Sequence, residues 1–198
     1  IRNRMATVSS TMQITSAMKM VSAAKLKKAQ DAITAMRPYA DKLTELLQSL
    51  SASLDADSGS KYSDNREVNK VLVVAITSNR GLAGAFNSNI LKQVTVLANQ
   101  TYAGKQVDFM AIGKKANDFL KKRKSTVIAN HSSLYEDLNF ENVAAIAEEL
   151  MEQFTSGNYD RIDIVYNKFK NAATQIVMTE QFLPIVSVEG GESSSTDY

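Results

Sequence analysis

Apolar side chains between residues 26 and 54 recur in steps that alternate between three and four residues. The stripe consists of Leu26, Ala29, Ile33, Met36, Ala40, Leu43, Leu47, Leu50 and Leu54. This spacing is that of the a/d seam of a coiled coil, which is narrower than the apolar face of a globular helix. Between Ile1 and Val21 the pattern is looser, but no glycine interrupts it. The pattern therefore predicts one long helix over residues 1–54.

Pro38 is the one residue in this stretch that opposes a continuous helix. Its ring removes a backbone donor and crowds the carbonyl group of Thr34. We expect a kink at this position, with a complete break of the helix as the alternative.

The length of the predicted helix indicates that its seam needs a partner. At 1.5 Å per residue the helix would extend about 80 Å, whereas a domain formed by residues 68–188 would be roughly 35 Å across. The seven larger seam side chains represent about 14 kcal/mol of burial, which equals the stability of an ordinary domain. Another chain, a copy of this one, or a segment outside this sequence must cover the seam.

After the helix, apolar β-branched runs alternate with helical patterns. Strands are predicted at residues 70–77, 106–112, 126–129, 161–169 and 173–183, and helices at residues 88–102, 114–124 and 140–154. Alternating strands and helices indicate an α/β fold with a mostly parallel sheet, and the last two strands indicate an antiparallel edge hairpin. We therefore divide the chain into a long helix (1–57), a linker (58–69), an α/β domain (70–188) and a Gly/Ser-rich tail (189–198) that we expect to be disordered.

Charge is distributed unevenly along a chain whose net charge is only +2. Residues 1–30 carry six basic and no acidic side chains, and residues 31–198 carry 17 basic and 21 acidic ones. The basic tip of the helix suits an acidic partner. Residues 1–38 lack aromatic side chains for stacking on bases, which argues against nucleic acid, and an acidic protein surface is favoured over a lipid headgroup.

The composition limits the chemistry of the chain. Without cysteine there is no disulfide, thiolate nucleophile or Cys-based zinc site, which fits a reducing compartment. His131 is the only histidine and is interpreted as a solvated side chain, as are the carboxylate pairs Glu136–Asp137 and Glu148–Glu149. We therefore expect no catalytic, metal or cofactor site.

The segment 78–87, SNRGLAGAFN, follows the first strand and leads into a helix, which is the layout of a phosphate-binding loop. A Walker loop requires a lysine and a hydroxyl residue after its last glycine, and a dinucleotide fingerprint requires a third glycine. Only Gly81 and Gly84 are present here, so a nucleotide-binding domain is the alternative function and a tight surface turn is favoured. A self-pairing coiled-coil adaptor is a further alternative.

Several segments together resemble the gamma subunit of F-type ATP synthases of the bacterial type. They are residues 1–30 (IRNRMATVSSTMQITSAMKMVSAAKLKKAQ), 37–40, 78–87, 111–123 (AIGKKANDFLKKR), 166–175 and 180–185 (EQFLPI). The resemblance implies a non-catalytic central shaft: an antiparallel coiled coil of N- and C-terminal helices with a Rossmann-like domain at its foot. The implied partners are the alpha and beta subunits around the tip, and the epsilon subunit and the membrane rotor ring at the foot. The implied location is the cytoplasmic face of the bacterial inner membrane, as a peripheral subunit.

By motif position, the resemblance implies that Arg4, Met18, Lys25 and Arg80 face the acidic lever region of beta. Ala83 stands where the family has cysteine, and a chloroplast-type regulatory dithiol insertion is missing. The C-terminal shaft helix also lies outside this sequence. We therefore expect that helix, or a second copy of this chain, to be the partner of the seam.

Overall fold

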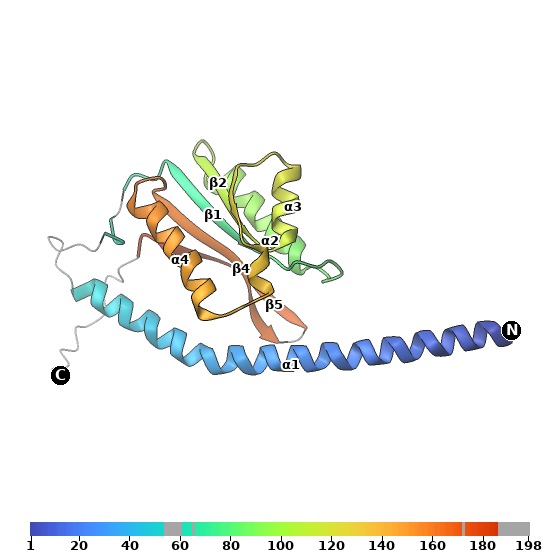
Figure 1. Ribbon diagram of the computed structural model, residues 1–198. Coiled ribbons are helices and arrows are strands. Elements are labelled where there is room, and N and C mark those ends of the chain that lie inside the picture. Colours follow the sequence, from blue (N-terminus) through green and yellow to red (C-terminus); the bar gives the residue numbers. More distant parts are fainter. Residues whose placement is uncertain (54–60, 65, 172, 186–198) are drawn as a thin grey trace. The chain divides into compact units, whose positions relative to one another are not determined.

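The structure is a computed structural model that describes residues 1–53, 61–64, 66–171 and 173–185 (Figure 1). The chain divides into two compact units, Ile1–Leu50 and Ser51–Tyr198. Residues 54–60 of the predicted linker, Leu54 of the seam and the predicted tail lie outside the described residues.

The helix α1 runs from Arg2 to Ser53 and forms the first unit up to Leu50. It continues through Pro38, so the alternative of a complete break at this residue is wrong. The ribbon of α1 curves along its length in Figure 1, and a localised kink stays a prediction. Good helix formers explain the continuity, because alanine, lysine, leucine, methionine and glutamine dominate the stretch and glycine is absent.

The second unit is built on a five-stranded sheet with the strand order β3-β2-β1-β4-β5. The strands are β1 (Lys70–Ile76), β2 (Gln106–Ile112), β3 (Val127–Asn130), β4 (Arg161–Asn171) and β5 (Thr174–Leu183). Neighbouring strands pair in parallel except β4 and β5, which form an antiparallel hairpin. This topology confirms the predicted α/β class with a mostly parallel sheet and an antiparallel edge.

Helices cover both faces of the sheet. They are α2 (Phe86–Val96), continued by a π-helical turn (Leu97–Thr101), α3 (Lys114–Lys122), a short 3₁₀ turn (Ser132–Tyr135) and α4 (Phe140–Thr155). Helices α2 and α3 pack against one face and α4 against the other. Because the central strand β1 is covered on both sides, five consecutive residues of it, Val71–Ala75, are buried, which is why its sequence does not alternate.

Two tyrosine–aspartate hydrogen bonds supply donors to buried carboxylates on opposite faces of the sheet. The Tyr102 hydroxyl donates to Asp163 of β4, and the Tyr159 hydroxyl donates to Asp108 of β2 over 3.0 Å. Arg161 completes the Asp163 site with an ion pair of 2.9 Å. Burial and the hydrogen bond to the neighbouring carboxylate both raise the pKa of each tyrosine above its ordinary value. Each tyrosine therefore stays a donor at neutral pH.

No helix in the described part of the chain is long and apolar enough to cross a lipid bilayer.

Candidate functional site

Three of the four candidate contact residues share one face of α1. Arg4, Met18 and Lys25 are separated by 14 and 7 residues, so they occupy the same position of the heptad repeat. All three side chains are exposed, and Met18 has 65% of its surface accessible. Lys25 directly precedes Leu26, the first residue of the regular seam, so this row of side chains ends where the seam begins.

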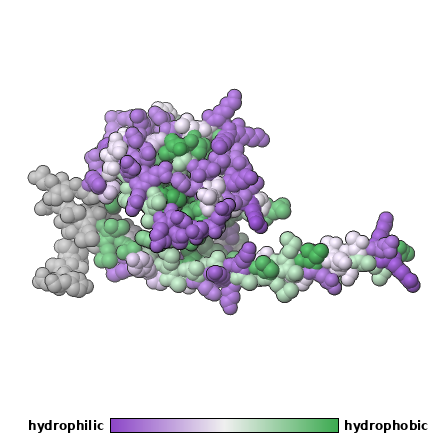
Figure 2. All heavy atoms as spheres, viewed as in Figure 1, coloured by the Kyte–Doolittle hydropathy of each residue, from purple (hydrophilic) through white to green (hydrophobic). Residues whose placement is uncertain are grey.

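The helix surface around these residues is weakly polar. Thr7, Thr11 and Thr15 donate their hydroxyl protons to backbone carbonyls four residues earlier, over 2.8–2.9 Å. Their hydroxyl groups are therefore satisfied within the helix, and they line a shallow hollow together with Val8, Met12 and Lys19. Green and white side chains predominate along the N-terminal half of α1 in Figure 2, with purple ones near its N-terminus.

The fourth candidate, Arg80, lies in the second unit, on the loop between β1 and α2. Asn87 at the start of α2 closes this loop: it accepts from the Ser78 backbone amide over 2.9 Å and donates to the Ser78 hydroxyl over 2.9 Å. The same amide group donates to the Arg80 carbonyl over 3.3 Å. We call these hydrogen bonds of Asn87 the Asn87 clasp. They fix the backbone of Arg80, whose side chain is exposed.

The tip of the loop also displays an apolar residue that sequence reasoning missed. Leu82 is fully exposed and has a φ of +58°, a left-handed conformation that costs a non-glycine residue roughly 1–2 kcal/mol. Gly84 follows with a φ of +55°. In the sequence, a large apolar residue between Gly81 and Gly84 is the signal that could have identified Leu82. An exposed leucine on a fixed backbone suits contact with a partner surface.

Next to this loop, the first backbone amides of α3 already have hydrogen-bond acceptors. The Lys114 amide donates to Asn79 Oδ1 over 2.9 Å, and the Ala116 amide donates to Thr77 Oγ1 over 2.8 Å. The Lys115 amide donates to the Ser78 carbonyl over 3.2 Å. Residues of the loop and of β1 therefore already satisfy these amides, so the N-terminus of α3 offers no site for a phosphate group. The loop itself leads into α2, and the alternative of a nucleotide site at Gly81 and Gly84 stays a hypothesis.

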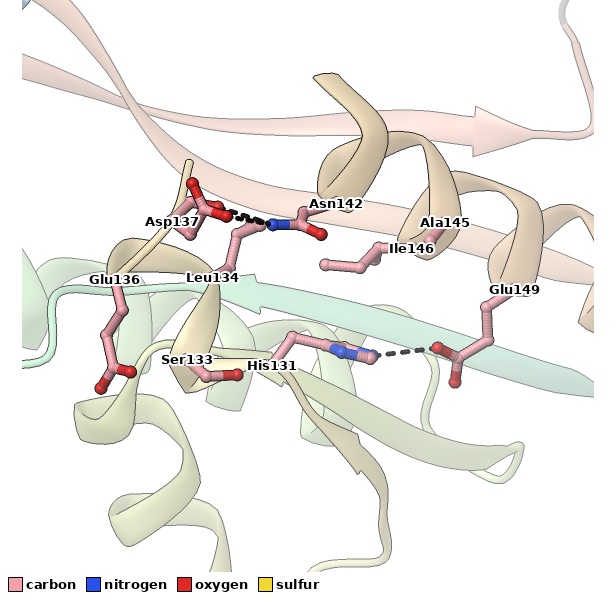
Figure 3. Close-up of a pocket in the computed structure, with 9 residues that line it drawn as sticks. All are labelled: His131, Ser133, Leu134, Glu136, Asp137, Asn142, Ala145, Ile146 and Glu149. Atoms are coloured by element: carbon pink, nitrogen blue, oxygen red, sulfur yellow. Dashed lines mark hydrogen bonds and ion pairs between the residues drawn. The ribbon is translucent and has the colours of Figure 1, made fainter. Parts of the chain in front are cut away.

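A cavity of about 440 Å³ lies between the 3₁₀ turn and α4 (Figure 3). His131 Nε2 and Glu149 Oε2 point toward one another in it and are 3.0 Å apart. The prediction that both side chains are solvated is therefore wrong, because the pair ties the end of β3 to α4. Among the described residues no three His, Cys, Asp or Glu side chains converge on a point where a metal could bind. We interpret the pair as structural.

Known proteins match this chain along its whole length. A family model described as ATP synthase matches residues 1–198. The ATP synthase gamma chain of Flavobacterium psychrophilum is 66% identical over 199 residues, and that of Flavobacterium johnsoniae is 64% identical over 201 residues. In each case the match covers 100% of this chain and 69% of the relative.

Solved structures give the same result for the fold. The rotor of Euglena gracilis mitochondrial ATP synthase matches with a TM-score of 0.60 at 26% identity, covering 88% of this chain and 58% of that chain. The central stalk and c-ring of the Tetrahymena thermophila mitochondrial enzyme contain a chain that matches with a TM-score of 0.61 at 29% identity, covering 86% of this chain and 72% of that chain. On the strength of the full-length family match and these identities, the chain belongs to the ATP synthase gamma chain family.

Proposed function

We propose that this chain forms the turning central shaft of an ATP synthase and transmits torque between a membrane rotor ring and the catalytic beta subunits. As a gamma chain it is a non-catalytic subunit of the complex. Its tip would lie among the alpha and beta subunits and its foot would meet the epsilon subunit and the ring, as a peripheral subunit on the cytoplasmic face of the membrane. The C-terminal helix of a longer shaft, or a second copy of the chain, would cover the seam.

The observation that carries this proposal is the row formed by Arg4, Met18 and Lys25. Two cations and a flexible methionine occupy one heptad position on the exposed part of α1 that precedes the apolar seam. Exposed ion pairs contribute only about 0–1 kcal/mol each, so an acidic surface would attract the row without locking it. Such contacts suit a part that moves against its partner.

We propose that Arg80 adds a second contact of the same kind from the loop of the second unit. Its backbone is held by the Asn87 clasp, so its side chain can be presented without ordering the loop at each encounter. The acidic lever region of beta is the proposed partner of all four residues.

The test compares two lysines that are two residues apart on α1 and therefore project from nearly opposite faces of the helix. In the complex assembled with this chain, Lys25→Glu should lower the protons pumped per ATP hydrolysed by about fivefold or more, because attraction becomes repulsion. Lys27→Glu carries the same charge change and should stay within about twofold of the native complex. Equal losses in the two variants, or no loss in either, would reject the proposed contact row.

A further inference from the structure

The outer surface of α4 is more apolar than its packing on the sheet requires. Ile146, Leu150 and Phe154 recur at four-residue intervals and are buried against the sheet. Phe140 and Val143, together with the half-buried Ala144 and Ala147, form a second stripe that is displaced around the helix from the buried one. We call these four residues the α4 stripe.

Phe140 is the most unusual member of the α4 stripe, with 82% of its surface exposed. Leu138 and Val143 occupy the positions of a hydrophobic staple, which explains why apolar residues occur there. Phe140 is the first residue of the helix and has no such role. It is also held on a well-ordered helix start, because the Asn139 side chain accepts from the Asn142 amide over 2.8 Å.

Carboxylates line one side of the α4 stripe. Glu141, Glu148 and Glu152 recur at helical spacing and are exposed, and we call them the α4 acidic row. The surrounding sequence reinforces their charge, because residues 125–160 contain seven carboxylates and neither lysine nor arginine. None of the three has an ion-pair partner in the described part of the chain.

From the α4 stripe and its acidic row we propose that this surface docks a segment of another subunit that carries an apolar side chain flanked by lysine or arginine. The apolar anchor would cover Phe140 and Val143, and its basic neighbours would face the acidic row, so that charge fixes the orientation of the segment. The proposal uses the membership of the chain in an ATP synthase complex and is independent of the contact row on α1.

The first experiment places a photoreactive benzoylphenylalanine at position 140 of this chain in the assembled complex, and at the exposed position 100 as the control. We expect position 140 to crosslink to a peptide of another subunit that contains an apolar residue beside lysine or arginine, in higher yield than position 100. Crosslinks only to α1, to a second copy of the chain or to an acidic or uncharged peptide would overturn the proposal. A yield no greater than that of position 100 would also overturn it.

A charge reversal then tests the acidic row. Glu148→Lys with Glu152→Lys should lower the crosslinking yield from position 140 by about tenfold. The matched pair Glu67→Lys with Asp118→Lys makes the same charge change at exposed positions outside α4 and should stay within about twofold. Losses of equal size in both pairs, or in neither, would overturn the proposal.

Failure of the proposed function can be distinguished from failure of this inference. Co-isolation of the native chain with the beta subunit reports on the function alone. If the chain does not co-isolate, fluorescence anisotropy of the isolated chain with a labelled synthetic helix of leucine and lysine decides the inference. That peptide must bind the native chain more tightly than the Glu148→Lys, Glu152→Lys variant, and absence of binding or equal binding would overturn the proposal.

Discussion

At the scale of single residues, Asp160 joins the start of β1 to the start of β4. Its Oδ2 accepts from the backbone amides of Asn69 and Lys70 over 2.9 and 2.8 Å. Burial by itself would raise the pKa of the Asp160 carboxyl group, but these two hydrogen bonds and the nearby Arg66 lower it below its ordinary value. At the start of the central strand β1, the Asp160 carboxylate thus takes the place of a backbone carbonyl group as hydrogen-bond acceptor.

The lowered pKa of Asp160 predicts a specific pH dependence of stability. An acidic group with a lowered pKa in the folded state stabilises the fold above its unfolded pKa, and that contribution is lost as the pH falls through its folded pKa. Asp160→Asn should therefore be less stable than the native protein at pH 7, and the difference should shrink below about pH 4. Urea unfolding of the isolated chain at a series of pH values measures this.

Asp118→Asn serves as the matched control for that series, because Asp118 is exposed on α3. Its difference from the native protein should be small and should not follow the same pH dependence. A difference between Asp160→Asn and the native protein that stays constant from neutral to acidic pH would contradict the role of the ionised carboxylate.

At the scale of elements, the turn from β2 into α3 depends on a close backbone approach. A Cβ atom at Gly113 would lie 2.0 Å from the Thr77 carbonyl oxygen, and the φ of Gly113 is +112°. The contact joins the ends of β1 and β2, where the Thr77 hydroxyl also accepts from the Ala116 amide. This contact holds together the carboxyl ends of the parallel strands β1 and β2, where the β1–α2 loop begins.

We expect Gly113→Ala to lower the free energy of unfolding by about 3 kcal/mol or more, because the backbone of Thr77 must move and its hydrogen bonds must be disturbed. Gly104→Ala is the matched control, because Gly104 also has a positive φ but has no atom within 4 Å of its added Cβ. The control should lose only about 1 kcal/mol from backbone strain. Denaturant unfolding compares the two, and equal losses would show that the close approach to Thr77 is unimportant.

Sequence periodicity was a good guide to elements formed by local or continuous patterns. The seam predicted α1, because a helix that buries one stripe has apolar residues at alternating intervals of three and four. The β-branched runs predicted β1 and β2, because a strand covered on both faces is apolar throughout. The helix predicted at residues 88–102 instead ends as an α-helix at Val96 and continues as a π turn. No local pattern marks that change, since the residues involved have ordinary helix propensity.

The candidate site was less predictable than the fold, because its features depend on contacts between distant residues. The Asn87 clasp joins residues nine positions apart, and the His131–Glu149 pair joins a strand end to a helix. Neither spacing belongs to a helix or strand repeat, so sequence reasoning placed His131 in solvent. The proposed contact residues on α1 came from family resemblance and stay a prediction, and the helix places them at one heptad position.

At the scale of the whole molecule, the two units carry different kinds of surface. The helical unit bears a basic N-terminal region followed by an apolar seam, whereas α4 in the second unit bears exposed carboxylates beside an apolar stripe. Opposite charges on the two units favour different partners for them. The proposed shaft would accordingly meet an acidic partner through its helical unit and a basic partner through α4.

The central claim is that this chain turns relative to the catalytic subunits. The most direct measurement attaches a visible probe to the exposed Lys121 position of this chain in a complex whose beta subunits are fixed to a surface, and follows the probe during ATP hydrolysis. We predict that the probe rotates continuously in one direction and stops when ATP is removed. A probe that keeps a constant orientation while ATP hydrolysis continues would contradict the account.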